Sequence, residues 1–130
     1  MIIADSSVWI DFFNDAPNPQ TDRLDGFIRR GPVLMGDLIL TEVLQGFRSE
    51  RDFQKAQQLL ANFPMIEIVG PRVALQSARN FRHLRSLGVT VRKTIDCLIA
   101  TRCIESGHAL LFSDRDFQPF VDHLGLEPAP

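Results

Sequence analysis

Four carboxylates stand at places in this sequence where an ionised group is costly to bury. Asp5 ends the short apolar run that opens the chain, and Asp114 follows the apolar run 109–113. Glu42 lies inside a third apolar segment, and Asp96 opens a fourth. An ionised carboxylate in apolar surroundings is strongly unfavourable unless it is paired, hydrogen-bonded or bound to a metal. These four positions therefore point to chemistry as well as to structure.

The elements around these acids are expected to bring them to one edge of a sheet. Apolar runs that are too short for a helix and lack a polar face predict buried strands of a parallel sheet. Asp5 and Asp114 each follow such a strand, and the carboxyl ends of parallel strands form the edge where open α/β sheets bind ligands. Glu42 and Asp96 lie on helices that leave the same edge. We therefore expect the four carboxylates to converge.

Strand-like and helix-like segments alternate along the whole chain. This alternation predicts parallel pairing with right-handed crossovers in an α/β fold, a single three-layer α/β/α domain that spans residues 1–130. Ser6 and Ser7 are the expected caps of a first helix that begins at about Val8. The predicted strands are residues 1–4, 32–35, 65–69 and 109–113, with an edge strand near Leu126. The predicted helices are residues 8–13, 21–30, 38–47, 50–62, 72–87, 95–106 and a short one through 117–121.

Converging carboxylates raise one another's pKa and need compensation. A hard divalent cation supplies it, because Mg²⁺ and Mn²⁺ take oxygen ligands and keep several waters. Such a cation can activate a water as a nucleophile and stabilise the oxygen that leaves a phosphodiester. The acids therefore predict metal-dependent phosphodiester hydrolysis.

Each acid also has a structural alternative. Asp5 can cap the first helix or finish a turn, and Asp96 can interact with a helix dipole, which contributes about 0.3–1 kcal/mol. Asp114 or Asp116 can cap a short terminal helix. Glu42 is the hardest of the acids to explain structurally. The functional interpretation depends on the coincidence of four acids at one edge.

Four segments resemble motifs of the PIN-domain ribonucleases and, within that family, of the VapC-type toxins of prokaryotic toxin–antitoxin pairs. They are residues 3–13 (IADSSVWIDFF), 41–46 (TEVLQG), 94–100 (TIDCLIA) and 113–117 (SDRDF). No segment is specific alone, but their order and spacing make the set specific. The resemblance covers nearly the whole chain.

The resemblance implies a PIN-like parallel sheet flanked by helices, with Mg²⁺ or Mn²⁺ as the cofactor and single-stranded or loop RNA, such as tRNA or another structured RNA, as the substrate. It also implies a small VapB-type antitoxin that wraps the toxin and occupies its site, and a homodimer. The site residues that it implies are Asp5, Glu42, Asp96 and Asp114 for metal binding and catalysis, with Asp116 and Ser7 as additional neighbours. If Asp5 is a metal ligand, we expect Ser6 and Ser7 to support it as well as to start the first helix.

The net charge of the chain does not indicate a nucleic-acid partner. The chain has 14 Lys and Arg against 16 Asp and Glu, a net charge of -2, which argues against a simple basic-patch binder. Arg92 and Lys93 precede the third motif and can reach phosphates at the site; the alternative is a solvated loop. Arg79, Arg82 and Arg85 form either an RNA track or a plain exposed helix face.

Other residues have simpler interpretations. The helix 72–87 is expected to turn Ala74, Ala78, Phe81 and Leu84 inward. Trp9, Phe12 and Phe13 are core residues or, alternatively, part of a groove for an antitoxin or dimer partner. Cys97 and Cys103 are expected to be buried without a disulfide. His83, His108 and His123 show no ligand spacing. The sequence lacks a signal-peptide pattern and an apolar run of roughly 18 residues, so we expect a cytoplasmic protein.

Three functions remain to be compared. The first is an endoribonuclease that cleaves RNA by in-line attack of a metal-activated water. The second is an aspartyl-phosphate phosphatase with Asp5 as its nucleophile, although Ser7 stands where the common phosphatase motif has a second Asp. The third is a PIN domain that binds RNA or a partner without catalysis; the presence of all four acids argues against it.

Overall fold

The structure is a computed structural model that describes residues 1–31 and 33–130. Its sheet has five strands in the order β3-β2-β1-β4-β5, and each described pair is parallel. The predicted start of the second strand at Pro32 lies outside the described residues. The strands are β1 (Ile2–Ala4), β2 (Val33–Gly36), β3 (Met65–Ile66), β4 (Ala109–Leu111) and β5 (Glu127–Pro128).

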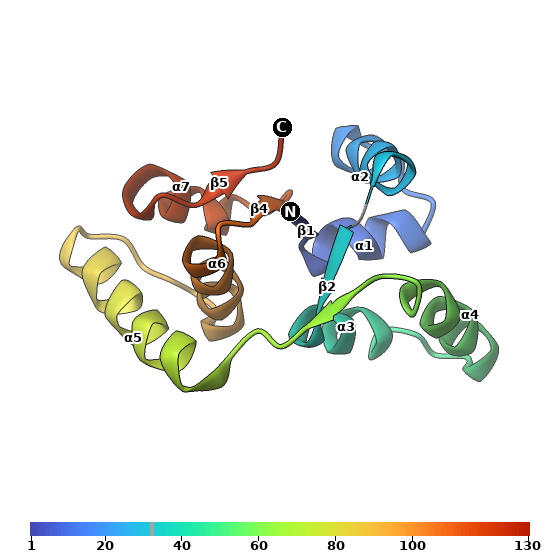
Figure 1. Cartoon of the computed structure of the whole chain (residues 1–130), viewed down its shortest axis with the longest axis horizontal. Helices are drawn as coiled ribbons and strands as arrows, with labels where there is room; N and C mark the ends of the chain where they lie inside the picture. Colours follow the sequence, from blue (N-terminus) through green and yellow to red (C-terminus); the bar gives the residue numbers. More distant parts are fainter. Residues whose placement is uncertain (32) are drawn as a thin grey trace.

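Helices cover both faces of this sheet. In Figure 1, α1, α2 and α4 lie on one side of the strands, and α5, α6 and α7 lie on the other; α3 packs against α1 and α4. The predicted three-layer α/β/α fold is confirmed. The helices are α1 (Ser6–Phe13), α2 (Pro19–Arg30), α3 (Asp37–Leu44), α4 (Glu50–Leu60), α5 (Gly70–Ser86), α6 (Thr94–Ser106) and α7 (Gln118–Leu124), with the 3-10 helix η1 (Arg115–Phe117) before α7.

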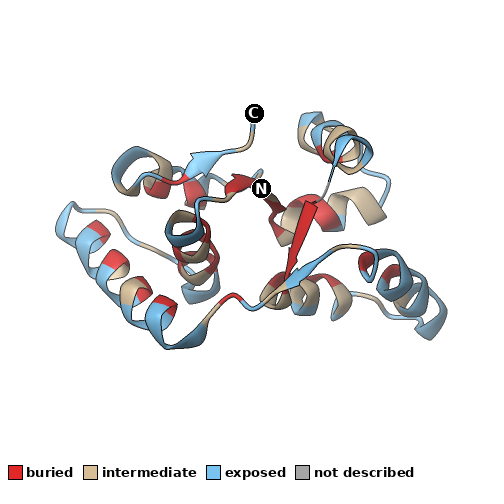
Figure 2. Ribbon diagram, viewed as in Figure 1, coloured by how far each residue is buried: buried red, intermediate tan, exposed pale blue. Residues whose placement is uncertain are grey.

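The three central strands are buried on both faces, as Figure 2 shows. Ile3 and Leu110, which pair across β1 and β4, are fully buried. Burial on both faces explains why these strands are short apolar runs without a polar alternation. Cys97 and Cys103 are buried and free, as predicted. No helix in the described part of the chain is long and apolar enough to cross a membrane.

The first helix starts earlier than predicted, and its cap is a different residue. α1 begins at Ser6, so Ser6 and Ser7 lie inside the helix, and Asp5 is the N-cap. The prediction that the two serines are the cap is therefore wrong, because Asp5 has the extended backbone and the acceptor oxygen that a cap needs. α2 also begins early, at Pro19, because Asn18 forms a capping box.

Two strands are shorter than predicted. β3 ends at Ile66 and β4 at Leu111, although the apolar patterns continue to residues 69 and 113. The sheet partners end at the same level: Gly36 pairs with Ile66, and Ala4 pairs with Leu111. Without a partner strand, the remaining apolar residues form loops that lead to the next helix.

The orientation of α5 differs from the prediction. Ala74 and Ala78, expected inside, are exposed, and the buried residues are Val73, Ser77, Asn80 and Leu84. The Ser77 hydroxyl donates to Cys97 Sγ at 3.2 Å. The amide of Asn80 donates to Thr101 Oγ1 at 3.0 Å. Polar side chains of α5 thus face α6, because α6 offers them hydrogen-bond partners.

Candidate active site

Asp5 lies at the carboxyl end of β1 and is only 3% exposed. Its backbone N–H donates to the carbonyl of Leu111 at 2.9 Å, which ties it to the end of β4. One carboxylate oxygen, Oδ2, accepts hydrogen bonds from the Ser7 hydroxyl at 2.9 Å and from the Ser7 N–H at 3.4 Å. Burial raises the pKa of Asp5, and the bonds from Ser7 partly offset this rise.

Glu42 lies on α3. Two contacts with Ile68, the residue two positions after β3, hold the start of this helix in place. Asp37 Oδ1 accepts the N–H of Leu38 at 2.8 Å and the N–H of Ile68 at 3.0 Å, so it joins α3 to the segment after β3. Gly36 lets Ile68 approach closely, since a Cβ there would lie 2.6 Å from the Ile68 Cδ1. Glu42 is half-buried. Its pKa is raised by burial and then by the charge of Asp5.

Asp96 lies in the first turn of α6 and is 6% exposed. Its pKa is raised to about 6, first by burial and then by the charge of Asp5, with smaller contributions from Glu42 and Asp114. Lys93, the residue before α6, lowers the pKa of both Asp96 and Glu42. Asp96 therefore lies among the other acids, with one lysine near enough to compensate part of their charge.

Asp114 and Asp116 complete the acidic edge after β4. Asp114 caps η1, since its Oδ1 accepts the N–H of Asp116 at 2.9 Å. One carboxylate oxygen each from Asp96, Asp114 and Asp116 lies within 4.8 Å of the other two. The charge of Asp114 also raises the pKa of Asp5. Capping and clustering thus coexist: the structural alternatives for Asp5 and Asp114 describe real contacts, and the carboxylates nevertheless gather at one edge.

Several oxygens at this edge lack a donor. Asp5 Oδ1, Glu42 Oε1 and Asp96 Oδ2 are buried and have no hydrogen-bond partner among the described residues. Buried acceptors are normally satisfied, and carboxylates this close together repel one another. A hard divalent cation would satisfy both requirements, because Mg²⁺ and Mn²⁺ prefer oxygen ligands. The side chains at this edge therefore fit such a cation.

Comparison with known protein families identifies this architecture. The sequence model described as the PIN domain matches residues 2–120, which include all five acids of the edge. The chain belongs to the PIN domain family. Two relatives are 24% identical to this chain over 131 residues, covering 99% of this chain and 98% of theirs. They are Ribonuclease VapC11 of Mycobacterium tuberculosis and VapC ribonuclease Mb1587 of Mycobacterium bovis.

Solved structures share the PIN fold at lower identity. VapBC2 from Rickettsia felis, bound to a DNA fragment from its promoter, contains a chain that superposes with a TM-score of 0.78 at 16% identity, covering 99% of this chain and 98% of that one. FitAcB from Neisseria gonorrhoeae gives a TM-score of 0.75 at 17% identity, covering 100% and 97%. These similarities support the fold described above.

The remaining predicted site residues of this PIN domain differ in their placement. The Ser7 hydroxyl contacts the Asp5 carboxylate directly. Lys93 is exposed and precedes the turn that carries Asp96. Arg92 is also exposed, and it makes no ion pair within residues 1–31 and 33–130. Lys93 is the basic residue that acts on the acids here, since it lowers the pKa of Glu42 and of Asp96.

Sequence reasoning assigned one residue of this PIN domain incompletely and missed another. Ser6 was expected at the start of the first helix and, with Ser7, as a support for Asp5; its hydroxyl also lowers the pKa of Glu42. Asp37 was not singled out, although it joins α3 to Ile68. The position of Asp37 at the start of the helix that carries Glu42 was the available signal. Its partner lies 31 residues later and could not be read from a local pattern.

The aromatic residues of α1 divide between the core and a hollow on the surface. Trp9 is fully buried, with its ring centroid 5.3 Å from that of Phe63. Phe12 and Phe13 are half-buried and line a hollow beside α2. The alternative that this hollow receives a partner stays a prediction.

Proposed function

We propose that this PIN domain is a metal-dependent endoribonuclease, the toxin of a VapBC-type pair. The observation that carries the proposal is the acidic edge itself. Five carboxylates from four segments of the chain gather there, and buried oxygens of three of them lack a donor. A protein gains no stability from such an arrangement unless something positively charged binds to it.

Four of the five acids have a proposed role in holding the cation, Mg²⁺ or Mn²⁺. Asp96, Asp114 and Asp116 would supply oxygens from the cluster within 4.8 Å, and Asp5 would add its free Oδ1. When bound, the cation supplies Lewis-acid stabilisation of a phosphodiester and an activated water. The Ser7 hydroxyl would hold Asp5 in place, since it bonds the other oxygen of that carboxylate.

Glu42 and Lys93 are proposed to act on the reacting groups. Burial raises the pKa of Glu42, which makes this carboxylate a better proton acceptor near neutral pH. It would orient a water and take up its proton through the unpartnered Oε1. The ammonium of Lys93 would offset phosphate charge as a strand approaches the acids.

Substrate and partners follow from the relatives. The two mycobacterial proteins are named ribonucleases, and the solved structures include toxin–antitoxin complexes. We therefore propose RNA as the substrate, tRNA or another structured RNA with accessible loops, and a VapB-type antitoxin as the partner. A homodimer that acts in the cytoplasm completes the proposal.

Cleavage assays test the enzyme directly. Purified protein is incubated with total tRNA and with a single-stranded RNA, in Mg²⁺, in Mn²⁺ and in EDTA. We expect cleavage with either cation and none in EDTA. Asp5→Asn should lower the rate at least 100-fold, the size of effect typical for loss of a catalytic charge. Asp52→Asn, at an exposed first-turn position of α4, is the matched control and should cleave normally.

The outcomes separate the three functions. Cleavage that survives EDTA or Asp5→Asn would contradict the proposed mechanism. RNA binding without cleavage under any condition would favour a non-catalytic PIN domain. A covalent phosphoryl group trapped on Asp5 would favour the phosphatase.

A further inference from the structure

Basic residues are segregated in one part of this chain. Residues 70–93, which form α5 and the loop to α6, contain six of the 14 Lys and Arg residues and none of the 16 acidic residues. We call this stretch the basic segment. Arg72 pairs with Glu105 at 3.5 Å, and the other five basic residues make no ion pair in the described parts of the chain. The basic segment therefore carries local positive charge on a protein whose net charge is negative.

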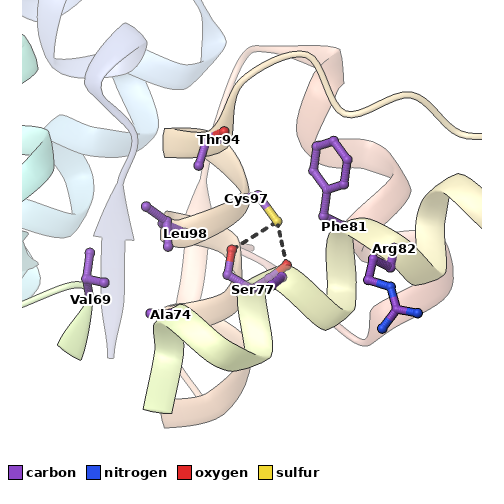
Figure 3. A pocket seen from close by; sticks show the side chains of 9 residues that line it. Val69, Ala74, Ser77, Phe81, Arg82, Thr94, Cys97 and Leu98 are labelled. Carbon is purple, nitrogen blue, oxygen red and sulfur yellow. Dashed lines mark hydrogen bonds between the residues drawn. The ribbon is translucent and has the colours of Figure 1, made fainter. Parts of the chain in front are cut away.

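A hollow of about 560 Å³ opens between the basic segment and α6 (Figure 3). We call it the α5–α6 hollow. Its floor is buried and closed by the hydrogen bonds between Ser77 and Cys97. Above the floor it is lined by the exposed Ala78, the half-buried Phe81 and Leu98, and the exposed Arg82 and Thr94. The lining is therefore mostly apolar, with an aromatic ring, a guanidinium and a hydroxyl at its margin.

This hollow and the acidic edge flank the same turn of α6. Thr94 opens α6 and lines the hollow, and Asp96 follows two residues later. At 3.6 residues per turn, the two side chains point to opposite sides of a helix roughly 10–12 Å across. Lys93 precedes this turn and acts electrostatically on Asp96. A strand that crosses the first turn of α6 would therefore pass the hollow, Lys93 and the carboxylates.

We propose that the α5–α6 hollow binds one unstacked base of a single-stranded RNA whose backbone follows the basic segment. The inference rests on the proposed nuclease function and adds a specificity pocket to it. Proteins that bind single-stranded RNA combine a positive track with aromatic rings on which bases stack. Phe81 supplies the ring, and the guanidinium of Arg85 lies 5.9 Å from its centroid. Arg82 and Thr94 supply donors for the base or its phosphate.

A second large hollow, among the residues that the structure describes, lacks this chemistry. It has a volume of about 590 Å³ and lies beside α1 and α2. Its lining includes Asp11, Asp15, Asp22 and Asp25, so it repels a polyanion. Charge complementarity therefore assigns the RNA strand to the α5–α6 hollow.

An abasic scan tests the inference without relying on cleavage. A defined single-stranded RNA that contains all four bases is labelled, and its binding is measured by fluorescence anisotropy in EDTA. Each nucleotide is then replaced in turn by an abasic one. We expect one position at which the replacement weakens binding about tenfold, as for loss of one stacked base. Replacements at distant positions should have little effect.

Variants of the hollow should remove this position dependence. Ala78→Trp fills the hollow from an exposed site, and Phe81→Leu removes the ring while keeping apolar volume. Both should bind the intact RNA about tenfold more weakly and no longer distinguish it from the abasic RNA. Because Phe81 also packs against the core, Ala78→Trp decides the matter if Phe81→Leu fails to fold.

A charge-matched pair separates the hollow from general attraction. Arg82→Glu should weaken binding and reduce its salt dependence. Arg51→Glu makes the same charge change on the exposed face of α4 and should do neither. The inference is overturned if Ala78→Trp keeps the abasic sensitivity, if Arg82→Glu and Arg51→Glu behave alike, or if the wild-type protein does not bind the RNA.

Two further outcomes separate the proposed base pocket from an interface between copies and from the nuclease function. If Ala78→Trp changes only the sedimentation of the protein and leaves RNA binding intact, the hollow belongs to an interface between copies and the inference is wrong. If the hollow variants behave as expected but the wild-type protein never cleaves RNA with Mg²⁺ or Mn²⁺, the base pocket stands and the nuclease function fails.

Discussion

Replacing Asp96 by asparagine should stabilise the metal-free protein while it abolishes the proposed activity. Asn has the shape of Asp without the charge. Asp96 is buried among Asp5, Glu42 and Asp114, whose charges raise its pKa. In Asp96→Asn that repulsion is absent. Stability and function are therefore expected to change in opposite directions.

The magnitude follows from the pKa. Asp96 moves from an ordinary value of 3.8 to about 6 in the folded chain. Well below pH 3.8 the carboxyl group is protonated in both states and contributes no difference. Well above pH 6 it is ionised in both, and a pKa difference of about 2 corresponds to a loss of about 3 kcal/mol. Water near the mouth of the site reduces this value, so we expect Asp96→Asn to gain about 1–3 kcal/mol at pH 7 and little at pH 4.

Urea unfolding in EDTA at pH 4, 5.5 and 7 measures the difference in free energy of unfolding between Asp96→Asn and the wild type. The free energy of unfolding of the variant should exceed that of the wild type by an amount that grows between pH 4 and 6 and then levels off. Asp52→Asn is the control, because it removes an exposed acid from the first turn of α4. It should lose about 0.3–1 kcal/mol through the helix dipole.

Two results would refute the reasoning. One is a difference in free energy of unfolding between Asp96→Asn and the wild type that does not change with pH. The other is a variant that is less stable than the wild type at pH 7 in EDTA, which would mean that the ionised carboxylate is satisfied within the metal-free fold.

Three further predictions concern the surroundings of the acids. Lys93→Gln should raise the pKa of Asp96 above about 6, because a compensating charge is lost; carboxyl-carbon NMR titration in EDTA measures the change, and an unchanged pKa would place the lysine away from the site. Asp37→Ala should cost about 1–3 kcal/mol in urea unfolding by leaving the N–H of Ile68 without its acceptor, and Asp37→Asn, which keeps the acceptor, should recover most of the loss. Gly36→Ala should cost about 1–3 kcal/mol through contact with Ile68, and Ile68→Val should relieve part of it if that contact is the cause.

The fold could be predicted because its buried strands are short, uniformly apolar runs in the sequence. A run such as Ile2–Ala4 is too short and too uniformly apolar for anything except a strand buried on both faces. Once two such strands end at the same edge, Asp5 and Asp114 must lie near each other. The edge could therefore be located from sequence, whereas the roles of its acids stay predictions that need the cleavage assays.

The orientation of α5 and the contact of Asp37 could not be predicted, because they depend on residues that are distant in the sequence. Periodicity placed the alanines of α5 inside, but Ser77 and Asn80 are buried there because α6 provides their partners. Similarly, Asp37 contacts Ile68 across 31 residues. Such pairs form only when the helices dock, so hydrophobic spacing alone could not place the α5–α6 hollow.

The acidic edge and the basic segment act on RNA in opposite ways: the first repels its phosphates and the second attracts them. This difference constrains the order of events in the proposed reaction. The acidic edge without a cation repels phosphate, because its ionised carboxylates carry the same sign of charge. The basic segment attracts the same strand a short distance away on the other side of α6. In metal-free protein the strand should therefore be held by the basic segment alone and kept from the acids. A divalent cation would neutralise part of the negative charge of the edge and offer the phosphate a positive centre. A phosphodiester would then be able to settle beside Glu42 and Asp96, so the proposed cation would control the approach of the substrate as well as its chemistry.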